Sequence, residues 1–346
     1  MRRDHTPRPP FRHEALLYSG REGFAEKLVP FVLDGIRGGE PTLVMAGPDR
    51  LEALWGRVGD GDGLVRYVDM HGVGRNPARI IPAWTDFARS GGRMRGIGEP
   101  IWPGRDAEEL VECHLHEALI NRAFTGATGF WLVCPYDVAG LAPAVIEAAR
   151  GTHPSTSNRL AAAERGADDA GARPRRAGGP RAPLATELPA PADDAIVVSF
   201  DRGSLSELRA VTLREGARAG LPAARVDDLT LAVSELATNS VDHGGGSGTA
   251  RFWRQEDALI CDVRDRGVVT DALSGRVRPG ADPARPRGLW LVNQLCDLVQ
   301  LRSSPATGSE VRIRMRAGAV NPGAAVAPGQ GVDATQGGES SAGRVG

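Results

Sequence analysis

The sequence lacks long apolar runs and has almost no net charge. Its 346 residues include 42 Lys and Arg and 43 Asp and Glu, a formal net charge of −1. Such a balance gives no reason to expect a nucleic acid or an anionic membrane as a partner. No apolar stretch approaches the ~20 residues that span a bilayer. The basic amino-terminal stretch MRRDHTPRPPFRHE has no apolar segment behind it, so it is not a secretory signal, and we expect a cytoplasmic protein.

Cysteine is scarce. The four cysteines lie far apart inside apolar segments: Cys113, Cys134, Cys261 and Cys296. This distribution favours buried free thiols in a reducing compartment over disulfides.

The segment ECHLHE at residues 112–117 raises the question of a metal site. Its Cys113, His114 and His116 lack the (i, i+4) spacing of two ligands on one helix face. No second cluster of ligand residues in the sequence completes a coordination shell. A plain helix is therefore the favoured interpretation.

Large apolar residues are also nearly absent from two stretches, residues 155–194 and 317–346, which are rich in Ala, Pro and Gly. Such segments bury too little surface to offset their chain entropy, which predicts a flexible linker and a disordered tail. Two folded blocks remain, residues 11–154 and 195–316.

The first block alternates apolar strands with helices. We predict strands at residues 41–47, 64–70 and 129–137, and helices at residues 48–58, 77–91 and 109–124, the second of which Pro82 could bend. This alternation indicates an α/β domain with a mainly parallel sheet. A glycine after the first strand and Asp137 at the end of the last are also features of P-loop ATPases. The Gly-Lys-Ser/Thr that cradles phosphates is missing, so no nucleotide is expected here.

Several phrases of this block occur together in one known domain: GRNPARIIPAW, GIGEPIWPGR, HEALINRAF, CPYD and THP. They resemble the MEDS sensory domain, the methanogen/methylotroph sensory type, over nearly all of residues 11–154. The resemblance implies a sensory role without specifying a ligand.

The second block contains the stretch LTLAVSELATNSVDHGGG at residues 229–246. Its helical part carries four polar residues on one side: Glu235, Asn239, Asp242 and His243. At ~100° per residue, the last three lie within ~80° of Glu235. The residues predicted to pack on a sheet lie on the opposite side: Val226, Leu229, Val233, Leu236 and Ser240. An ordinary surface helix would explain a polar side, but this one has no Lys or Arg and runs directly into three glycines, whose backbone can approach a ligand closely.

Two further motifs follow. In ALICDVRDRG an alternating strand ends at Asp265, with Gly267 two residues later; a carboxylate there can accept a hydrogen bond from an exocyclic amine, although an ordinary hairpin turn would give the same pattern. In ARPRGLWLV, Gly288 opens a helix whose free amides suit a phosphate. The polar Gly/Pro loop between these motifs is either disordered or a ligand lid.

Together these motifs resemble the GHKL ATPase domain over residues 195–316, which has a two-layer α/β sandwich fold. ELATNSVDHG matches its N box, DRG and RGLWLV its two glycine boxes, and TGSEV its last motif. SELATNSVDHG and RGLWLVNQLCDLVQLR are most similar to bacterial anti-sigma-factor serine/threonine kinases. Val268 and Val269 stand where the first glycine box usually has a further glycine and a proline.

The resemblance implies a role for each matched residue. Asn239 holds Mg²⁺ on ATP, and Glu235 acts as general base on the incoming hydroxyl or orients it. Asp242 and His243 either support the Mg²⁺ shell or simply end the helix. The remaining residues form two groups. The adenine group is Asp265, Gly267, Gly308 and a hydroxyl at Thr307 or Ser309; the phosphate group is Arg287, Gly288 and Leu289.

The implied function is an ATP-dependent anti-sigma regulatory factor in transcription regulation. Such a kinase phosphorylates a STAS-domain antagonist, sequesters a sigma factor, and binds neither nucleic acid directly nor a membrane. The family commonly forms homodimers, and the sequence does not decide the oligomeric state. A sensor histidine kinase shares the ATP-binding fold, but a Pro/Ala/Gly linker occupies the place of its phosphoacceptor hairpin. A non-catalytic module in which ATP only switches binding is the third alternative.

Overall fold

The computed structural model describes residues 9–157, 184–279 and 287–318 as two α/β domains. The predicted linker falls largely on residues 158–183 and the predicted tail largely on 319–346, both outside the described residues. The first residues of the predicted linker, Ser155–Ser157, form a strand that pairs with the first strand of the chain. Within the described residues, no helix is both long and apolar enough to cross a membrane.

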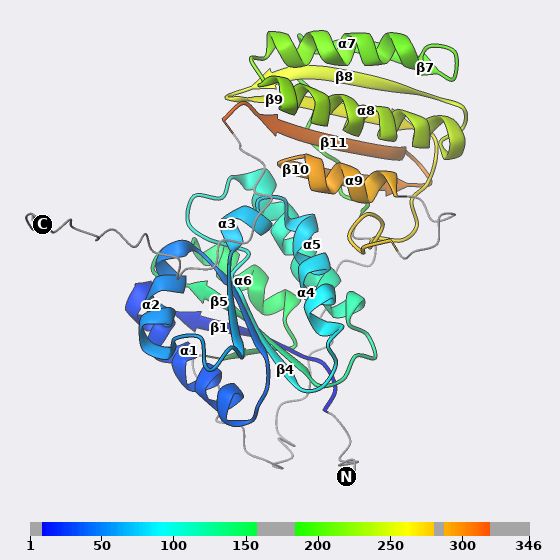
Figure 1. Ribbon diagram of the computed structural model, residues 1–346. Helices are drawn as coiled ribbons and strands as arrows, with labels where there is room; N and C mark the ends of the chain where they lie inside the picture. Colours follow the sequence, from blue (N-terminus) through cyan, green and yellow to red (C-terminus); the bar gives the residue numbers. More distant parts are fainter. Residues whose placement is uncertain (1–8, 158–183, 280–286, 319–346) are drawn as a thin grey trace, which may run out of the picture.

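The first domain is built on a six-stranded sheet in the order β3-β2-β4-β5-β1-β6, whose strand pairs are all parallel (Figure 1). Its elements are β1 (Arg12–Tyr18), α1 (Gly20–Arg37), β2 (Thr42–Ala46), α2 (Pro48–Val58), β3 (Val65–Asp69), α3 (Met70–Val73), η1 (Pro77–Arg79), α4 (Ile80–Ala88), β4 (Met94–Gly98), α5 (Ala107–Ala123), β5 (Phe130–Asp137), α6 (Pro143–Thr152) and β6 (Ser155–Ser157). The predicted parallel α/β class is confirmed. One apolar core lies between the sheet and α1 and α2, and a second between the sheet and α4, α5 and α6.

Pro82 lies in the first turn of its helix and not in the helix interior. A 3₁₀ turn precedes α4, so Pro82 is the third residue of that helix. Backbone N–H groups in a first helical turn have no partner within the helix, and proline is tolerated there.

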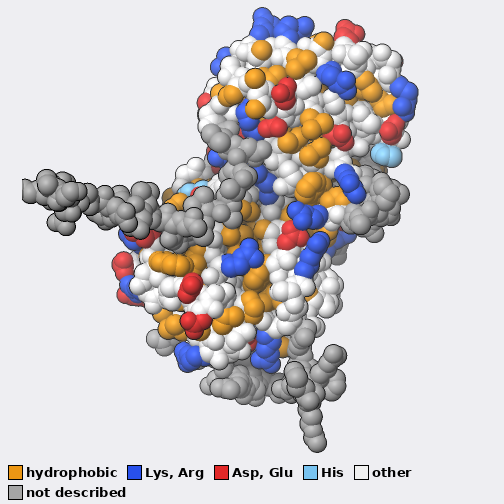
Figure 2. All heavy atoms as spheres, in the orientation of Figure 1, with side chains coloured by type: hydrophobic (Ala, Val, Ile, Leu, Met, Phe, Trp, Pro, Cys, Tyr) orange, Lys and Arg blue, Asp and Glu red, His pale blue; other side chains and the backbone are white. Residues whose placement is uncertain are grey.

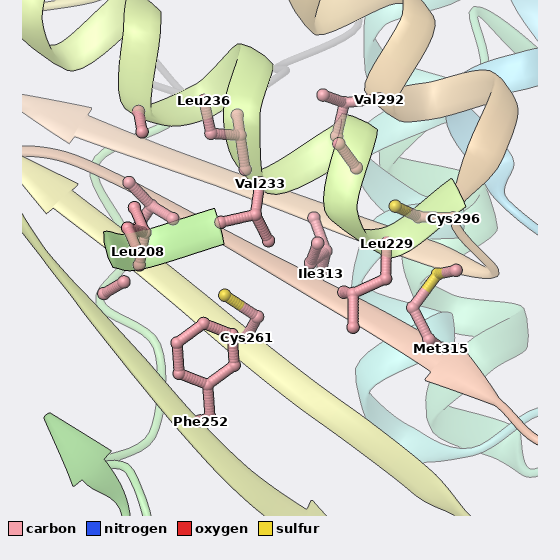
Figure 3. Packing of buried hydrophobic residues seen from close by; sticks show 14 of the residues in the cluster. Leu208, Leu229, Val233, Leu236, Phe252, Cys261, Val292, Cys296, Ile313 and Met315 are labelled. Carbon is pink, nitrogen blue, oxygen red and sulfur yellow. The ribbon is translucent and has the colours of Figure 1, made fainter. Parts of the chain in front are cut away.

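The second domain is a five-stranded antiparallel sheet in the order β10-β11-β9-β8-β7. Its elements are β7 (Ile196–Asp201), α7 (Leu205–Arg218), α8 (Ala223–His243), β8 (Ser247–Gln255), β9 (Ala258–Asp265), α9 (Gly288–Leu295), β10 (Leu298–Ser304) and β11 (Gly308–Arg316). The three helices share one apolar core with the sheet (Figure 3), to which α8 contributes Leu229, Val233 and Leu236. The predicted two-layer sandwich is confirmed.

Helix α5 lies between the two domains and is buried on two sides. A capping box between Asp106 and Glu109 starts it. Cys113 and Ile120 pack against the first domain's sheet, whereas Leu115 and Leu119 pack against Leu301 and residues 269–273 of the second domain. This double burial explains why the sequence of α5 shows no single apolar stripe.

Charge complementarity accompanies this packing. Glu112 is fully buried and accepts hydrogen bonds from Arg302 at 2.7 Å and Arg276 at 2.9 Å. At the start of the helix, Asp106 also pairs with Arg314 and Arg316. Figure 2 shows basic side chains near the junction of the two domains. Carboxylates of α5 therefore meet arginines of the second domain across the interface.

Candidate functional site

Helix α8 separates its apolar and polar residues as the sequence predicts. Val226, Leu229, Val233, Leu236 and Ser240 are buried. Glu235 and Asn239 are half-buried, whereas Asp242 and His243 are exposed. Solvent exposure along the polar side therefore increases from the middle of α8 to its carboxyl end.

Gly288, the first residue of α9, lies directly against the sheltered part of this stripe. A Cβ added there would be 2.7 Å from Glu235 Oε2 and 3.1 Å from Asn239 Nδ2. Any larger residue would displace one of these side chains. The glycine thus brings the backbone at the start of α9 next to a carboxylate and an amide.

Asp265 is held in place where β9 ends. Its Oδ1 accepts a hydrogen bond from Gly267 N at 2.7 Å, and its Oδ2 accepts one from Ser240 Oγ at 2.6 Å. A Cβ at Gly244 would be 2.4 Å from Asp265 Cγ, so the end of α8 approaches this carboxylate as only glycine allows. Two anchoring bonds and this close contact fix the orientation of Asp265.

The neighbouring hydroxyls are placed differently. Ser309 pairs with Asp265 across the sheet, is buried, and donates from Oγ to the Gly267 carbonyl at 2.9 Å. Gly308 has φ +76°, and a Cβ there would be 2.1 Å from the Asp265 carbonyl oxygen. Thr307 is exposed in the preceding turn, where its hydroxyl contacts Ser304 Oγ at 2.8 Å. Of the two predicted hydroxyls, Ser309 is the one beside Asp265.

A cavity of about 510 Å³ opens between α8, β9, β11, α9 and residues 267–279. This volume suits a nucleotide-sized ligand. Six predicted site residues line it: Asn239, His243, Asp265, Gly267, Leu289 and Ser309. Six others do not: Glu235, Asp242, Arg287, Gly288, Thr307 and Gly308. Two of these six nevertheless lie against residues that line the cavity: Gly288 against Asn239 and Gly308 against Asp265. The Glu235 carboxylate also lies beside Gly288.

Besides Thr307, two of the predicted residues outside the cavity lining are exposed. Asp242 forms an exposed ion pair with Arg202 at 2.5 Å. Its proposed role as a support for the Mg²⁺ ligands stays a prediction. Arg287 is exposed and precedes α9. The residues before it, 280–286, lie outside the described part of the chain.

Two features of this cavity were not predicted from the sequence. Ser240 was assigned to the packing face alone, yet its hydroxyl anchors Asp265. The buried position of a serine on an apolar face was the available signal, because such a hydroxyl requires a partner. The other feature is an apolar wall, formed by Leu236, Val263, Val269, Leu273, Leu301 and Val311.

A polar group lies at the carboxyl ends of the first domain's strands, and only its member Asp137 stood out in the sequence. Tyr18 ends β1 and donates to Glu99, which follows β4, while Arg50 pairs with Asp137 at 3.1 Å. Burial raises the pKa of Glu99 to about 7, although hydrogen bonding from Tyr18 opposes the shift. Open parallel sheets bind ligands at this edge. These four side chains are therefore a candidate binding site for a ligand of the first domain.

The helix predicted at ECHLHE is confirmed as part of α5, and only the statement about a second cluster of ligand residues is wrong. The sequence analysis found no cluster that could complete a coordination shell, yet Glu117 of this segment lies within 4.8 Å of ligand atoms of His13, Cys134 and His153. The other three ligands come from distant parts of the chain, so spacing within the segment could not reveal them. Cys113 lies apart from this cluster and donates to the Pro100 carbonyl at 3.3 Å.

Comparisons with known proteins agree with this division of the chain. Residues 12–154 match the family model of the MEDS domain, the methanogen/methylotroph, DcmR sensory domain. Residues 198–315 match the model of the histidine kinase-like ATPase domain. None of the curated proteins matches the chain.

Among solved structures, the chain is similar to the RsbU and RsbW domains of Rv1364c from Mycobacterium tuberculosis. The identity is 18%, the match covers 37% of this chain and 33% of that chain, and the TM-score is 0.28. This chain therefore spans about a third of the length of that protein chain. The family matches and the two observed folds together establish that the chain joins a MEDS sensory domain to a histidine kinase-like ATPase domain.

Proposed function

We propose that the second domain binds Mg·ATP and transfers the γ-phosphoryl group to a serine or threonine of a STAS-type anti-sigma antagonist. The same domain would bind a sigma factor, with the MEDS domain controlling both activities. The observation that carries this proposal is the pairing of a fixed Asp265 inside the cavity with Glu235 and Asn239 beside Gly288.

Asp265 is suited to recognise the base. Each carboxylate oxygen already accepts one hydrogen bond, from Gly267 N or Ser240 Oγ, and each has a second lone pair. An adenine amine can therefore donate to Asp265 without breaking either anchor. The apolar wall would cover the faces of the purine. Ser309 lies beside Asp265, where its hydroxyl could hydrogen-bond to the purine edge directly or through a water.

The other end of the site suits the triphosphate. The start of α9 offers backbone N–H groups and a positive helix end, both of which favour phosphate. Asn239 supplies an amide oxygen, the type of ligand that Mg²⁺ accepts. The ion would reduce the negative charge on the phosphates, and Asn239 is the residue that would hold it.

Glu235 is the proposed general base. Its carboxylate lies beside Gly288, where the phosphates would be, and is half-buried. From there it would accept the proton of the incoming hydroxyl as the oxygen attacks phosphorus and the bond to ADP breaks. A serine or threonine of a docked protein would supply that hydroxyl.

The histidine-kinase alternative lacks support in the described residues. That class needs an accessible phosphoacceptor histidine, and the described residues just before the second domain, 184–195, contain no helix. In the first domain, His13 and His116 of the two His-Glu pairs are buried, and the exposed His71 lies on α3, a helix of only four residues. A non-catalytic, ATP-switched binding module remains the second candidate, because residues 269–273 form both cavity wall and interdomain contact.

One experiment separates these functions. The full chain is incubated with γ-labelled Mg·ATP and a panel of STAS proteins, and the labelled product is treated with acid. Acid-stable label on the STAS protein supports the proposal, whereas acid-labile label on the chain itself indicates a histidine kinase. Nucleotide binding that alters sigma-factor affinity without any transfer would establish the switched binder instead.

A further inference from the structure

Four side chains with metal-ligand atoms meet inside the MEDS domain. They come from separate elements between the sheet and helices α5 and α6: His13 on β1, Glu117 on α5, Cys134 on β5 and His153 just after α6. His13 Nε2 lies 3.2 Å from Cys134 Sγ and 3.2 Å from Glu117 Oε2. His153 Nε2 is also 3.2 Å from Glu117 Oε2. All four residues are buried.

Hydrogen bonds outside the cluster fix both imidazole rings. His13 Nδ1 is 3.0 Å from Asn121 Oδ1, and the Nδ2 of Asn121 donates to two backbone carbonyls, so Oδ1 is the acceptor facing the ring. His153 Nδ1 is 2.8 Å from the Ala149 carbonyl oxygen, which can only accept. Each Nδ1 therefore carries a proton. A neutral ring then directs its Nε2 lone pair into the cluster, the arrangement that outer hydrogen bonds impose on metal-binding histidines.

With the rings neutral, the centre of the cluster contains acceptors facing one another. Both Nε2 atoms lie 3.2 Å from Glu117 Oε2, and a ring protonated only on Nδ1 has no Nε2 proton to bridge this contact. In the described part of the chain, neither oxygen of Glu117 nor His153 Nε2 has a hydrogen-bond partner of good geometry, and the buried Tyr136 hydroxyl, which interacts with Glu117, has none either. Buried acceptors without partners destabilise a fold. A cation at the centre would satisfy all of them at once.

We propose that His13, Glu117, Cys134 and His153 bind one zinc ion. Two imidazole nitrogens, a thiolate and a carboxylate oxygen form a donor set that Zn²⁺ binds tetrahedrally. Zinc bonds of ~2.0–2.3 Å place tetrahedral ligand atoms about 3.3–3.7 Å apart. Three separations are already 3.2 Å and all four ligand atoms lie within 4.8 Å of one another, so the ligands would need to close in by about 1.5 Å at most. Cys134 would lose its thiol proton to solvent as the Zn–S bond forms.

The competing explanation is a metal-free proton network. In it, Cys134 donates its thiol proton to His13 Nε2, and a protonated His153 pairs with Glu117. This network would leave the chain without specific affinity for zinc. It would also make Cys134 replaceable by serine, which is another small hydrogen-bond donor.

The chain offers matched controls for the test. Cys113 is a second buried thiol of the same domain and lies outside the cluster. His116, on α5, is a third buried histidine of this domain and is not a member either. Full-length wild type, Cys134→Ser, His153→Gln, Cys113→Ser and His116→Gln are purified, stripped with a chelator and titrated with Zn²⁺ against a chromophoric competitor. Thermal unfolding is followed with and without the metal.

We expect wild type and both controls to bind one equivalent of Zn²⁺ and to unfold at higher temperature with it. Cys134→Ser and His153→Gln should bind at least 10–100-fold more weakly. Failure of wild type to bind a stoichiometric ion, or equal binding by Cys134→Ser, would overturn the proposal. If the cluster variants do not fold, Co²⁺ added to stripped wild type decides. A thiolate-to-cobalt absorption band, retained in Cys113→Ser, supports the site, and its absence in wild type refutes it.

Discussion

The substitution Asp265→Asn tests the assignment of the base-recognition residue with little disturbance to the fold. Ser240 Oγ donates to Asp265 Oδ2 and lies 3.1 Å from the Leu236 carbonyl oxygen, so its hydroxyl can turn to that carbonyl. An asparagine Nδ2 in place of Oδ2 would then donate to Ser240, while the remaining oxygen keeps the bond from Gly267 N. The anchors survive, and only the acceptor offered to the ligand changes.

The expected cost concerns nucleotide binding alone. An amide nitrogen facing the adenine amine leaves a buried donor unpaired, which costs about 1–3 kcal/mol. At ~1.4 kcal/mol per tenfold change, the Kd for Mg·ATP should rise about 5- to 150-fold. Calorimetry measures this affinity, and thermal unfolding without nucleotide should change little.

Asp257→Asn is the control, because Asp257 immediately precedes the opposite end of β9 and does not line the cavity. Its Kd should match that of wild type. If Asp265→Asn binds Mg·ATP as tightly as wild type, Asp265 does not contact the base and the orientation of the ligand in the cavity is wrong. GTP presents a carbonyl where ATP has an amine, so an asparagine amide should not weaken its binding. An equal rise in the Kd for GTP would refute the same reasoning.

Three further predictions follow from the same geometry. Glu235→Ala should slow single-turnover phosphotransfer about 10²- to 10⁴-fold while Mg·ATP affinity stays within a few-fold of wild type. Asn239→Ala should also weaken Mg·ATP binding. If both variants lose the same rate and the same affinity, the two residues do not have separate roles. Glu112→Gln should lower the thermal stability of the full chain, since it leaves buried arginines poorly paired, by up to about 3–5 kcal/mol. Glu108→Gln, on a more exposed ion pair, should change it by less than about 1 kcal/mol, and the opposite ranking would contradict the interface. Residues 195–316 expressed alone should fold and bind ATP by circular dichroism and calorimetry, and an unfolded fragment would show that the first domain is required.

The sequence predicted those parts of the fold whose physics is local. Helix α8 is an example, because the spacing of Leu229, Val233 and Leu236 alone specifies the buried side. The strand that ends at Asp265 followed from alternation in the same way, whereas its antiparallel partner β8 was not predicted. Polar residues next to glycine motifs located the candidate site, since only glycine permits the approaches at Gly244 and Gly288.

Strand β1 was missed because its stabilising contacts are distant in sequence. RHEALLY begins with three polar residues and does not show a strand pattern. In the fold, Glu14 accepts hydrogen bonds from Trp131 and Ser155, more than 100 residues away. His13 joins the four-residue cluster in the same manner. Such partners become visible only after the chain has folded, which is why neither the strand nor the cluster could be predicted.

Helix α5 has a consequence for how the two domains influence each other. Glu112 faces the arginines of the ATPase domain, and Glu117, five residues later, faces the cluster in the MEDS domain. The two carboxylates are separated by about 7.5 Å along one helix axis, since each residue rises 1.5 Å. A helix transmits rotation or translation along its length, so an event that moves Glu117 also strains the contacts of Glu112. Thermodynamic linkage is reciprocal: if occupancy of the cluster changes nucleotide affinity by some factor, nucleotide must change the affinity of the cluster for its ion by the same factor.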